Sequence, residues 1–249
     1  MPQRELIAAG CFGLLLSWAA CTSAPNTPQG RHLSAVDVFN GTPIIDGSGA
    51  DAPWDTLPWY PMESLWQGQS SGAADFKGRY KICWDENNLY LLVETEDDSL
   101  REALTSQREN PLQADCLIVF IDEDVSDGDP VRDYNAFVYH VLLDGRVLGR
   151  APDSSWQLFD DHCWVRRIDR GEARSTWEMA IRVYDGKRYR QGGENIPKLL
   201  TRGKKIGFAL AYGDCDGGLE WESVVGSFSL PSASTPWQTA DGFSLLRLF

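Results

Sequence analysis

Short runs of β-type residues, separated by Gly, Pro, Asn and Asp, make up most of the chain after residue 36. Stretches with the 3.6-residue period of an amphipathic helix are scarce, and we expect one short helix around residues 99–107. Many short strands bounded by turn residues are typical of sandwiches. The pattern therefore predicts an all-β fold: an antiparallel two-sheet, jelly-roll-like β-sandwich with few short helices.

The clearest predicted unit is a hairpin of two strands at residues 79–84 and 89–94. The turn between them reads Asp-Glu-Asn-Asn, and Asp and Asn tolerate left-handed backbone angles. Because side chains alternate across a strand, Tyr80, Ile82 and Trp84 share one face. We expect that face to point into the core.

Residues 116–121 are apolar at every position, which indicates a central strand covered on both faces. A turn is expected at Asp144 and Gly145. Further strands are expected at residues 136–143, 146–148, 175–183, 205–212, 221–228 and 243–248.

The first twenty residues are predicted to be an export signal. Arg4 supplies a positive charge, residues 6–16 are largely apolar, and small residues precede Cys21. The sequence SWAAC at 17–21 resembles a bacterial lipoprotein signal, with Trp18 where Leu is usual, and this implies lipidation of Cys21. An ordinary cleaved signal or an uncleaved apolar N-terminus remains the alternative.

The predicted organisation is therefore a signal peptide at 1–20, a lipid-anchored polar tether at 21–36 and a β-sandwich at 37–249. The tether is rich in Pro, Thr and Ser. The corresponding location is that of an exported, membrane-anchored bacterial lipoprotein, at the outer membrane or facing the periplasm.

The net charge of −13 argues against nucleic acids and anionic membrane surfaces as partners. Neutral ligands and metal cations fit this charge better. No phosphate-cradling glycine loop occurs, so a nucleotide is not expected either.

Beyond the signal region, four cysteines remain, and in an oxidising compartment they could form three alternative pairings or stay as buried free thiols. The sequence does not choose between these states. They are Cys83, Cys116, Cys163 and Cys215.

Six segments in collinear order resemble the family 9 carbohydrate-binding modules. They are GTPIIDG at 41–47 with a following Trp54, WDENNLYLLV at 84–93, DCLIVFID at 115–122, WEMAI at 177–181, IGF at 206–208 and GFSLLRL at 242–248. The resemblance implies a β-sandwich that binds sugars, often carried on polysaccharide-degrading enzymes, with structural calcium in some members.

In the best-known sugar site of that family, two Trp side chains sandwich a sugar ring while a Glu and an Arg hydrogen-bond its hydroxyls. The resemblance places Trp237 at one Trp position. Leu112 stands at the second Trp position, Ile118 at the Glu and Val138 at the Arg. The resemblance thus implies a retained scaffold whose specificity is altered, moved or lost.

Trp side chains in loops offer the flat apolar faces on which sugar rings stack, although each could instead cap the core. The predicted ligand-binding residues are Trp237, Trp66, Trp156, Trp59 and Gln113. Three other Trp residues lie within strand patterns and are expected in the core. They are Trp84, Trp177 and Trp221.

An acidic turn region, which continues to Asp133, is a candidate calcium site, because its carboxylates would repel one another unless solvated or bridged by a cation. Its predicted ligands are Asp122, Asp124, Asp127 and Asp129. The spacing is not that of an EF-hand, and a solvated acidic loop is the alternative. Asp214 and Asp216 form a second, weaker candidate.

Catalytic motifs are missing: neither His-Glu-x-x-His nor Gly-x-Ser-x-Gly occurs. Carboxyl pairs such as Asp97 and Asp98, or Asp160 and Asp161, could serve glycoside hydrolysis, but 36 acidic residues make such pairs common by chance. His140 shares a strand face with apolar neighbours and is expected to be a satisfied core histidine.

The leading interpretation is non-catalytic binding of oligo- or polysaccharide by an exported lipoprotein, accessory to polysaccharide capture or breakdown. Two alternatives remain open. One is an envelope domain that keeps the sandwich but binds a protein, and the other is a glycoside hydrolase or part of one.

Overall fold

A computed structural model describes residues 35–69, 75–103, 110–126, 128–130, 132–230 and 236–249. The expected signal peptide, Cys21 and nearly all of the expected tether lie outside these residues. In the described residues, none of the helices is long and apolar enough to span a bilayer.

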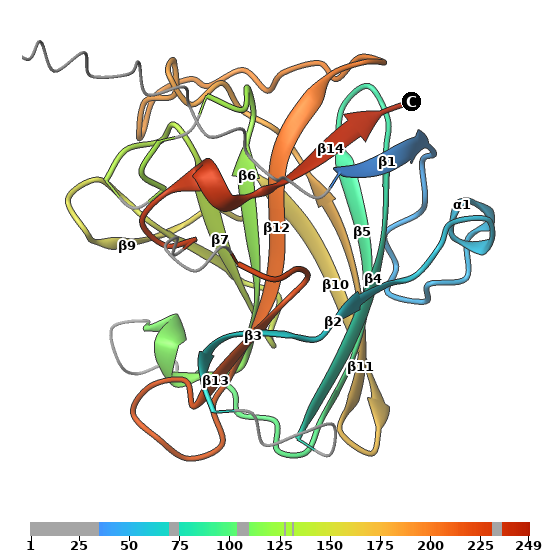
Figure 1. The fold of residues 1–249 in the computed structure, drawn as a ribbon, viewed down its shortest axis with the longest axis vertical. Coiled ribbons are helices and arrows are strands. Elements are labelled where there is room, and N and C mark those ends of the chain that lie inside the picture. Colours follow the sequence, from blue (N-terminus) through green and yellow to red (C-terminus); the bar gives the residue numbers. More distant parts are fainter. Residues whose placement is uncertain (1–34, 70–74, 104–109, 127, 131, 231–235) are drawn as a thin grey trace, which may run out of the picture. The chain divides into compact units, whose positions relative to one another are not determined.

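The described residues form fourteen strands and three short helical segments (Figure 1). The strands are β1 (Ala35–Asn40), β2 (Tyr60–Met62), β3 (Ser64–Gly68), β4 (Phe76–Trp84), β5 (Leu89–Asp97), β6 (Cys116–Asp122), β7 (Phe137–Leu142), β8 (Val147–Arg150), β9 (Trp156–Leu158), β10 (Cys163–Gly171), β11 (Arg174–Ile181), β12 (Lys205–Asp214), β13 (Ser223–Gly226) and β14 (Ser244–Leu248). The helical segments are α1 (Ala52–Asp55), η1 (Pro111–Gln113) and η2 (Ala240–Gly242).

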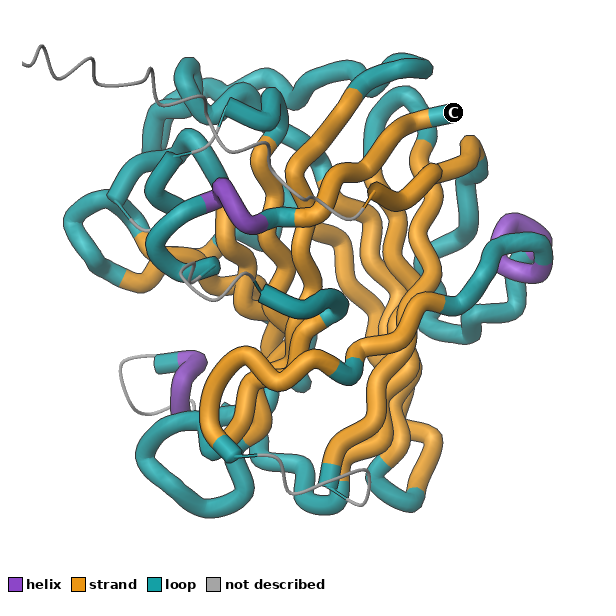
Figure 2. The backbone as a smooth tube through the Cα atoms, viewed as in Figure 1, coloured by secondary structure: helices purple, strands orange, loops and turns teal. Residues whose placement is uncertain are grey.

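The strands form two sheets that are continuous through β1 (Figure 2). The first sheet runs in the order β9-β8-β7-β6-β12-β14-β1, with β13 paired to β12 and β3 paired to β13. The second runs β1-β4-β5-β11-β10, with β2 paired to β4. The all-β prediction is therefore confirmed.

The prediction of a purely antiparallel fold is wrong at β1. Residues 35–38 of β1 pair in parallel with β14, and Phe39 and Asn40 then pair in parallel with the end of β4. One strand thus hydrogen-bonds to both sheets, which a pattern of apolar positions cannot reveal because β1 is only partly buried.

The main core fills the space between the two sheets. In β6, Leu117, Val119 and Ile121 point into it, and they meet the opposite face from β4, where Tyr80, Ile82 and Trp84 lie as expected. Leu117 is fully buried, so truncation to Ala should cost about 2–5 kcal/mol.

The turn between β4 and β5 forms at the expected place, by a different mechanism. None of its residues has a positive φ. Instead, the Asp85 carboxylate accepts hydrogen bonds from the backbone N–H groups of Asn87 and Asn88, at 2.8 and 2.9 Å. At the other expected turn, Gly145 does adopt a left-handed φ of 88°.

The short helix expected at 99–107 is not found in its described part, because residues 99–103 have no helical structure and the remainder lies outside the described residues. The strand β10 was not anticipated, although Cys163 and Val165 are buried and alternate with exposed Trp164 and Arg166.

The four cysteines beyond the signal region are all buried free thiols. Trp84, Trp177 and Trp221 are buried, as expected.

Candidate functional site

The outer face of the first sheet carries a second apolar cluster, separate from the core between the sheets. Because β6 and β7 alternate, Ile118, Phe120, Val138 and His140 point away from the main core and into this outer cluster. The strand β6 is thus covered on both faces, as its continuous apolar sequence predicts. This outer cluster forms the base of a pocket.

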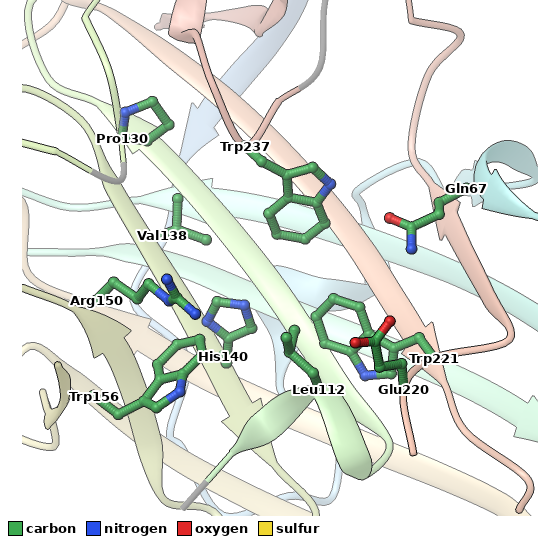
Figure 3. A pocket seen from close by; sticks show the side chains of 10 residues that line it. All are labelled: Gln67, Leu112, Pro130, Val138, His140, Arg150, Trp156, Glu220, Trp221 and Trp237. Atoms are coloured by element: carbon green, nitrogen blue, oxygen red, sulfur yellow. The ribbon is translucent and has the colours of Figure 1, made fainter. Parts of the chain in front are cut away.

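The pocket has a volume of about 280 Å³ and draws its walls from several strands and loops (Figure 3). Its lining residues are Gln67, Leu112, Pro130, Val138, His140, Arg150, Trp156, Glu220, Trp221 and Trp237.

Three aromatic rings lie side by side at the pocket, each facing the viewer in Figure 3. The rings of His140 and Trp237 have centroids 6.1 Å apart and planes inclined by 12°, and those of His140 and Trp221 are 5.8 Å apart and inclined by 19°. The two indoles are 5.7 Å apart. We call these three side chains the aromatic floor.

Trp156 stands as a wall beside the floor. Its ring is 5.1 Å from that of His140 and inclined by 85°. The guanidinium of Arg150 lies 4.8 Å from the Trp156 ring centroid, which is a cation–π distance. Trp156 and Arg150 are cross-strand neighbours on β9 and β8, so the ladder itself brings them together.

Polar groups at the pocket are few and lie around apolar surface. Arg150 supplies hydrogen-bond donors, Glu220 supplies acceptors and Gln67 supplies both. Apolar faces with a few converging polar groups are the usual composition of small-molecule sites.

His140 is buried beneath the pocket, with 3% of its surface exposed. Burial lowers the pKa of its imidazole to about 3, while a hydrogen bond with the Leu148 backbone opposes that shift. The ring is therefore neutral near pH 7. The residue is a buried histidine, as expected, but its Nδ1 atom has no hydrogen-bond partner among the described residues.

The sequence-predicted ligand-binding residues separate into two groups. Trp237 and Trp156 line the pocket. Trp66 packs against the same outer cluster without lining the pocket, and it donates its indole N–H to the Phe228 carbonyl at 2.7 Å. The structure does not bring the other two into the lining: Gln113 ends η1, and Trp59 packs on the opposite sheet under the Arg79 guanidinium.

The positions where the sequence departs from the familiar sugar clamp do converge here. Leu112 and Val138 line the pocket, and Ile118 is fully buried in the same outer cluster. The polar groups come from elsewhere. In the antiparallel register that pairs His140 with Leu148, Arg150 lies opposite Val138.

Sequence reasoning missed Arg150, Glu220, and the second role of Trp221, which is buried and yet lines the pocket. One signal was available for Arg150, since it shares strand parity with Leu148 on the outer face of β8. No comparable signal marks Glu220, which lies in a loop.

Carboxylates gather at a second place, where β5, β6 and β12 begin or end. Ligand atoms of Asp97, Asp115 and Asp214 lie within 4.8 Å of one another, and all three residues are buried. Burial, reinforced by neighbouring carboxylates, raises the pKa of Asp115 to about 7 and that of Asp214 to about 8. The Oδ1 atom of Asp214 has no hydrogen-bond partner among the described residues.

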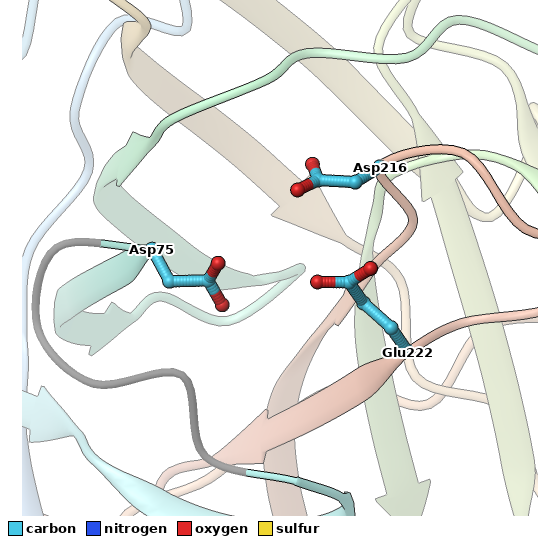
Figure 4. A group of neighbouring side chains, drawn as sticks. All are labelled: Asp75, Asp216 and Glu222. Atoms are coloured by element: carbon cyan, nitrogen blue, oxygen red, sulfur yellow. The ribbon is translucent and has the colours of Figure 1, made fainter.

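A more exposed acidic group adjoins this buried triad. The carboxylates of Asp75, Asp216 and Glu222 point toward one another (Figure 4). Asp216 also lies within reach of Asp97 and Asp98, so it connects the exposed group with the buried one.

The acidic loop predicted to hold calcium is arranged differently. Asp124 pairs with Lys187 at 2.7 Å and Asp129 with Arg132 at 3.4 Å, while Asp122 is buried at the end of β6. Asp122, Asp124 and Asp129 do not form a ligand set in the described part of the chain, and Asp127 lies outside it.

Residues 45–249 match the family model described as "Carbohydrate family 9 binding domain-like". Endo-1,4-beta-xylanase A of Thermotoga neapolitana is 36% identical over 118 residues, and its counterpart from Thermotoga maritima is 34% identical over the same length. Each match covers 45% of this chain and only 10% of the xylanase.

Two solved structures from Caldicellulosiruptor kristjanssonii share the fold. A family 9 carbohydrate-binding module in complex with glucose has a TM-score of 0.65 at 19% identity, covering 87% of this chain and 96% of the other. A second, in complex with cellotriose, has a TM-score of 0.61 at 18% identity, covering 86% and 93%.

Proposed function

Because the chain belongs to the carbohydrate family 9 binding domain-like family, we propose that it binds carbohydrate without cleaving it, in the pocket on the outer face of the first sheet. The observation that carries this proposal is the aromatic floor of Trp237, Trp221 and His140, walled by Trp156 and edged by Arg150.

The geometry suits a pyranose ring. The axial C–H groups of one sugar face would cover the aromatic floor, releasing water from apolar surface on both partners. Arg150 would donate hydrogen bonds to ring hydroxyls, and Glu220 would accept them. A pocket of about 280 Å³ lies near the lower end of the range for ligand sites, which favours one or two sugar rings.

The arrangement differs from a two-Trp sandwich. With Leu112 in place of a facing indole, the sugar would be held from one face and one side. Arg150 lies on the strand next to that of Val138. It would make the hydrogen bonds to sugar hydroxyls that an arginine makes in the best-known sugar site of the family. We infer altered specificity rather than lost binding.

The sugars to test first come from the relatives. Glucose and cellotriose are present in the two solved modules, and two matched proteins are xylanases. Calorimetric titration of the protein with cellotriose and xylotriose should show saturable heat, together with a change in Trp fluorescence. No heat and no fluorescence change with either sugar at millimolar concentration would contradict the proposal.

We also propose a structural calcium ion at Asp97, Asp115 and Asp214 instead of the acidic loop after β6. Hard carboxylate oxygens are what calcium prefers, and a bound cation would favour the charged form of carboxylates whose burial disfavours it. The partnerless Oδ1 of Asp214 fits that donor set. Calorimetry with calcium after chelation should show binding that Asp214→Asn abolishes and that Asp55→Asn, at an exposed position, leaves intact.

For location, we propose export and lipid attachment at Cys21, which would hold the sugar-binding domain at the bacterial envelope for polysaccharide capture. Expression in a bacterial host should place the protein in the membrane fraction. Cys21→Ala should release it, whereas Cys215→Ala, in the sandwich, should not. Equal membrane association of both variants would contradict lipidation at Cys21.

A further inference from the structure

We propose that His140 determines specificity in the pocket, because its Nδ1 atom accepts a hydrogen bond from a hydroxyl group of the bound sugar. The inference rests on the sugar-binding function proposed above. It adds a requirement for the ligand: a free hydroxyl at the position that reaches this ring.

The starting observation is a buried polar atom without a hydrogen-bond partner. Such an atom typically destabilises a protein unless a bound molecule satisfies it, and native structures hold few of them. In the described part of the chain, Nδ1 of His140 and Oδ1 of Asp214 are both in this state. The Asp214 atom lies in the carboxylate triad, whereas His140 lines the pocket.

A neutral imidazole allows Nδ1 to act as a hydrogen-bond acceptor. Burial keeps the imidazole neutral, so one ring nitrogen carries a hydrogen and the other a lone pair. Nδ1 is a buried ring nitrogen without a hydrogen-bond partner in the described part of the chain. The proposal requires the tautomer with the hydrogen on Nε2, which leaves the lone pair on Nδ1.

The surroundings restrict which donor can arrive. The ring centroids of Trp221, Trp237 and Trp156 lie 5.1–6.1 Å from the centroid of the imidazole (Figure 3). His140 is only 3% exposed. Because Nδ1 is itself shielded from solvent, a sugar O–H group would reach it only as the surrounding side chains shift on binding. An ether, a carboxylate or a deoxy carbon at that position has no hydrogen to donate.

His162 provides an internal control. It is also buried, but both its ring nitrogens have partners: Nδ1 lies 2.8 Å from the Tyr139 hydroxyl and Nε2 lies 3.1 Å from that of Tyr189. It should not respond to a ligand in the pocket.

The test is ¹⁵N NMR of the protein labelled at histidine, titrated with cellotriose while Trp fluorescence reports occupancy. The His140 Nδ1 resonance should move toward the hydrogen-bonded range as the site fills, and both His162 resonances should stay in place. His140→Phe, which keeps a flat ring, assigns the signal. If fluorescence saturates while His140 Nδ1 does not move, this inference is wrong and the proposed function stands.

Calorimetry with glucose and its monodeoxy analogues gives a second measurement. The native protein should bind one analogue about tenfold more weakly than glucose, and His140→Phe should bind that analogue and glucose equally. Equal discrimination by both proteins would overturn the inference. If no sugar binds by any readout, the proposed function and this inference fail together.

Discussion

Replacing Trp237 with Ala should weaken sugar binding more than any other single truncation in the pocket. Trp237 is a ring of the aromatic floor and lies in a loop, half-buried against Phe120, whose ring centroid is 5.1 Å away. Its removal deletes the apolar surface on which the sugar face would rest, and leaves β6 and β7 in place.

The magnitude follows from area. An aromatic side chain can bury about 150–250 Å², and a half-buried indole leaves on the order of 50 Å² for a ligand. The sugar face loses a similar area, so about 100 Å² at ~25 cal/mol per Å² gives about 2.5 kcal/mol. That corresponds to roughly a 60-fold loss of affinity.

The assay is calorimetric titration with cellotriose, supported by thermal unfolding to show that each variant is folded. Trp164→Ala is the matched control, because Trp164 is 59% exposed on β10, outside the pocket lining. Trp59→Ala, at another position on the second sheet, is a further control. Both controls should bind as the native protein does, and equal affinities for Trp237→Ala and Trp164→Ala would refute the assignment of the site.

Three further results are expected. Arg150→Ala should weaken cellotriose binding about tenfold by calorimetry, whereas Arg166→Ala, which removes a similar cation–π partner outside the pocket, should not; equal effects would contradict a role in binding. Chelating calcium should lower the melting temperature, since an ion at 100 times its Kd contributes about 2.7 kcal/mol, and Asp214→Asn should be insensitive to the chelator. Because the pKa of His140 is low in the folded state, the stability that its neutral ring contributes above about pH 6.5 is lost as the pH falls toward 3, by on the order of 4 kcal/mol. The free energy of unfolding of His140→Phe should therefore depend less on pH. Identical pH dependences in the native protein and the variant would argue against a buried neutral imidazole.

The cation and sugar sites share chain segments, so they should influence one another. The Trp221 indole donates its N–H to the Ala114 carbonyl, directly before Asp115, at 2.9 Å. Its ring also lies against Gly213, directly before Asp214. Calcium removal should therefore weaken cellotriose binding as well, and an affinity unchanged by chelation would show that the two sites are independent.

Local patterns were sufficient for much of the sandwich. The apolar run of β6 predicted a strand covered on both faces, and Asp144 and Gly145 predicted the turn before β8. The strand prediction depends on side-chain alternation, and the turn prediction depends on the backbone freedom of one residue. Both are properties of residues that are close in sequence.

The site itself was only partly predictable. Trp237 and Trp156 were identified because loop indoles are natural sugar platforms, but the same reasoning also selected Trp59, which packs on the opposite sheet. The presence of a Trp in a loop does not indicate which of the two sheets that loop covers. That choice depends on contacts between distant segments.

The class of fold, the buried strands and the family resemblance could be predicted without a structure, because burial and alternation follow from the order of consecutive residues. Tertiary contacts place Arg150 opposite Val138 and bring Glu220 to the same pocket. They also bring Asp97, Asp115 and Asp214 together, although more than 100 residues separate the first from the last. Strand register and loop packing set these distances, and both arise from contacts between parts of the chain that are far apart in sequence.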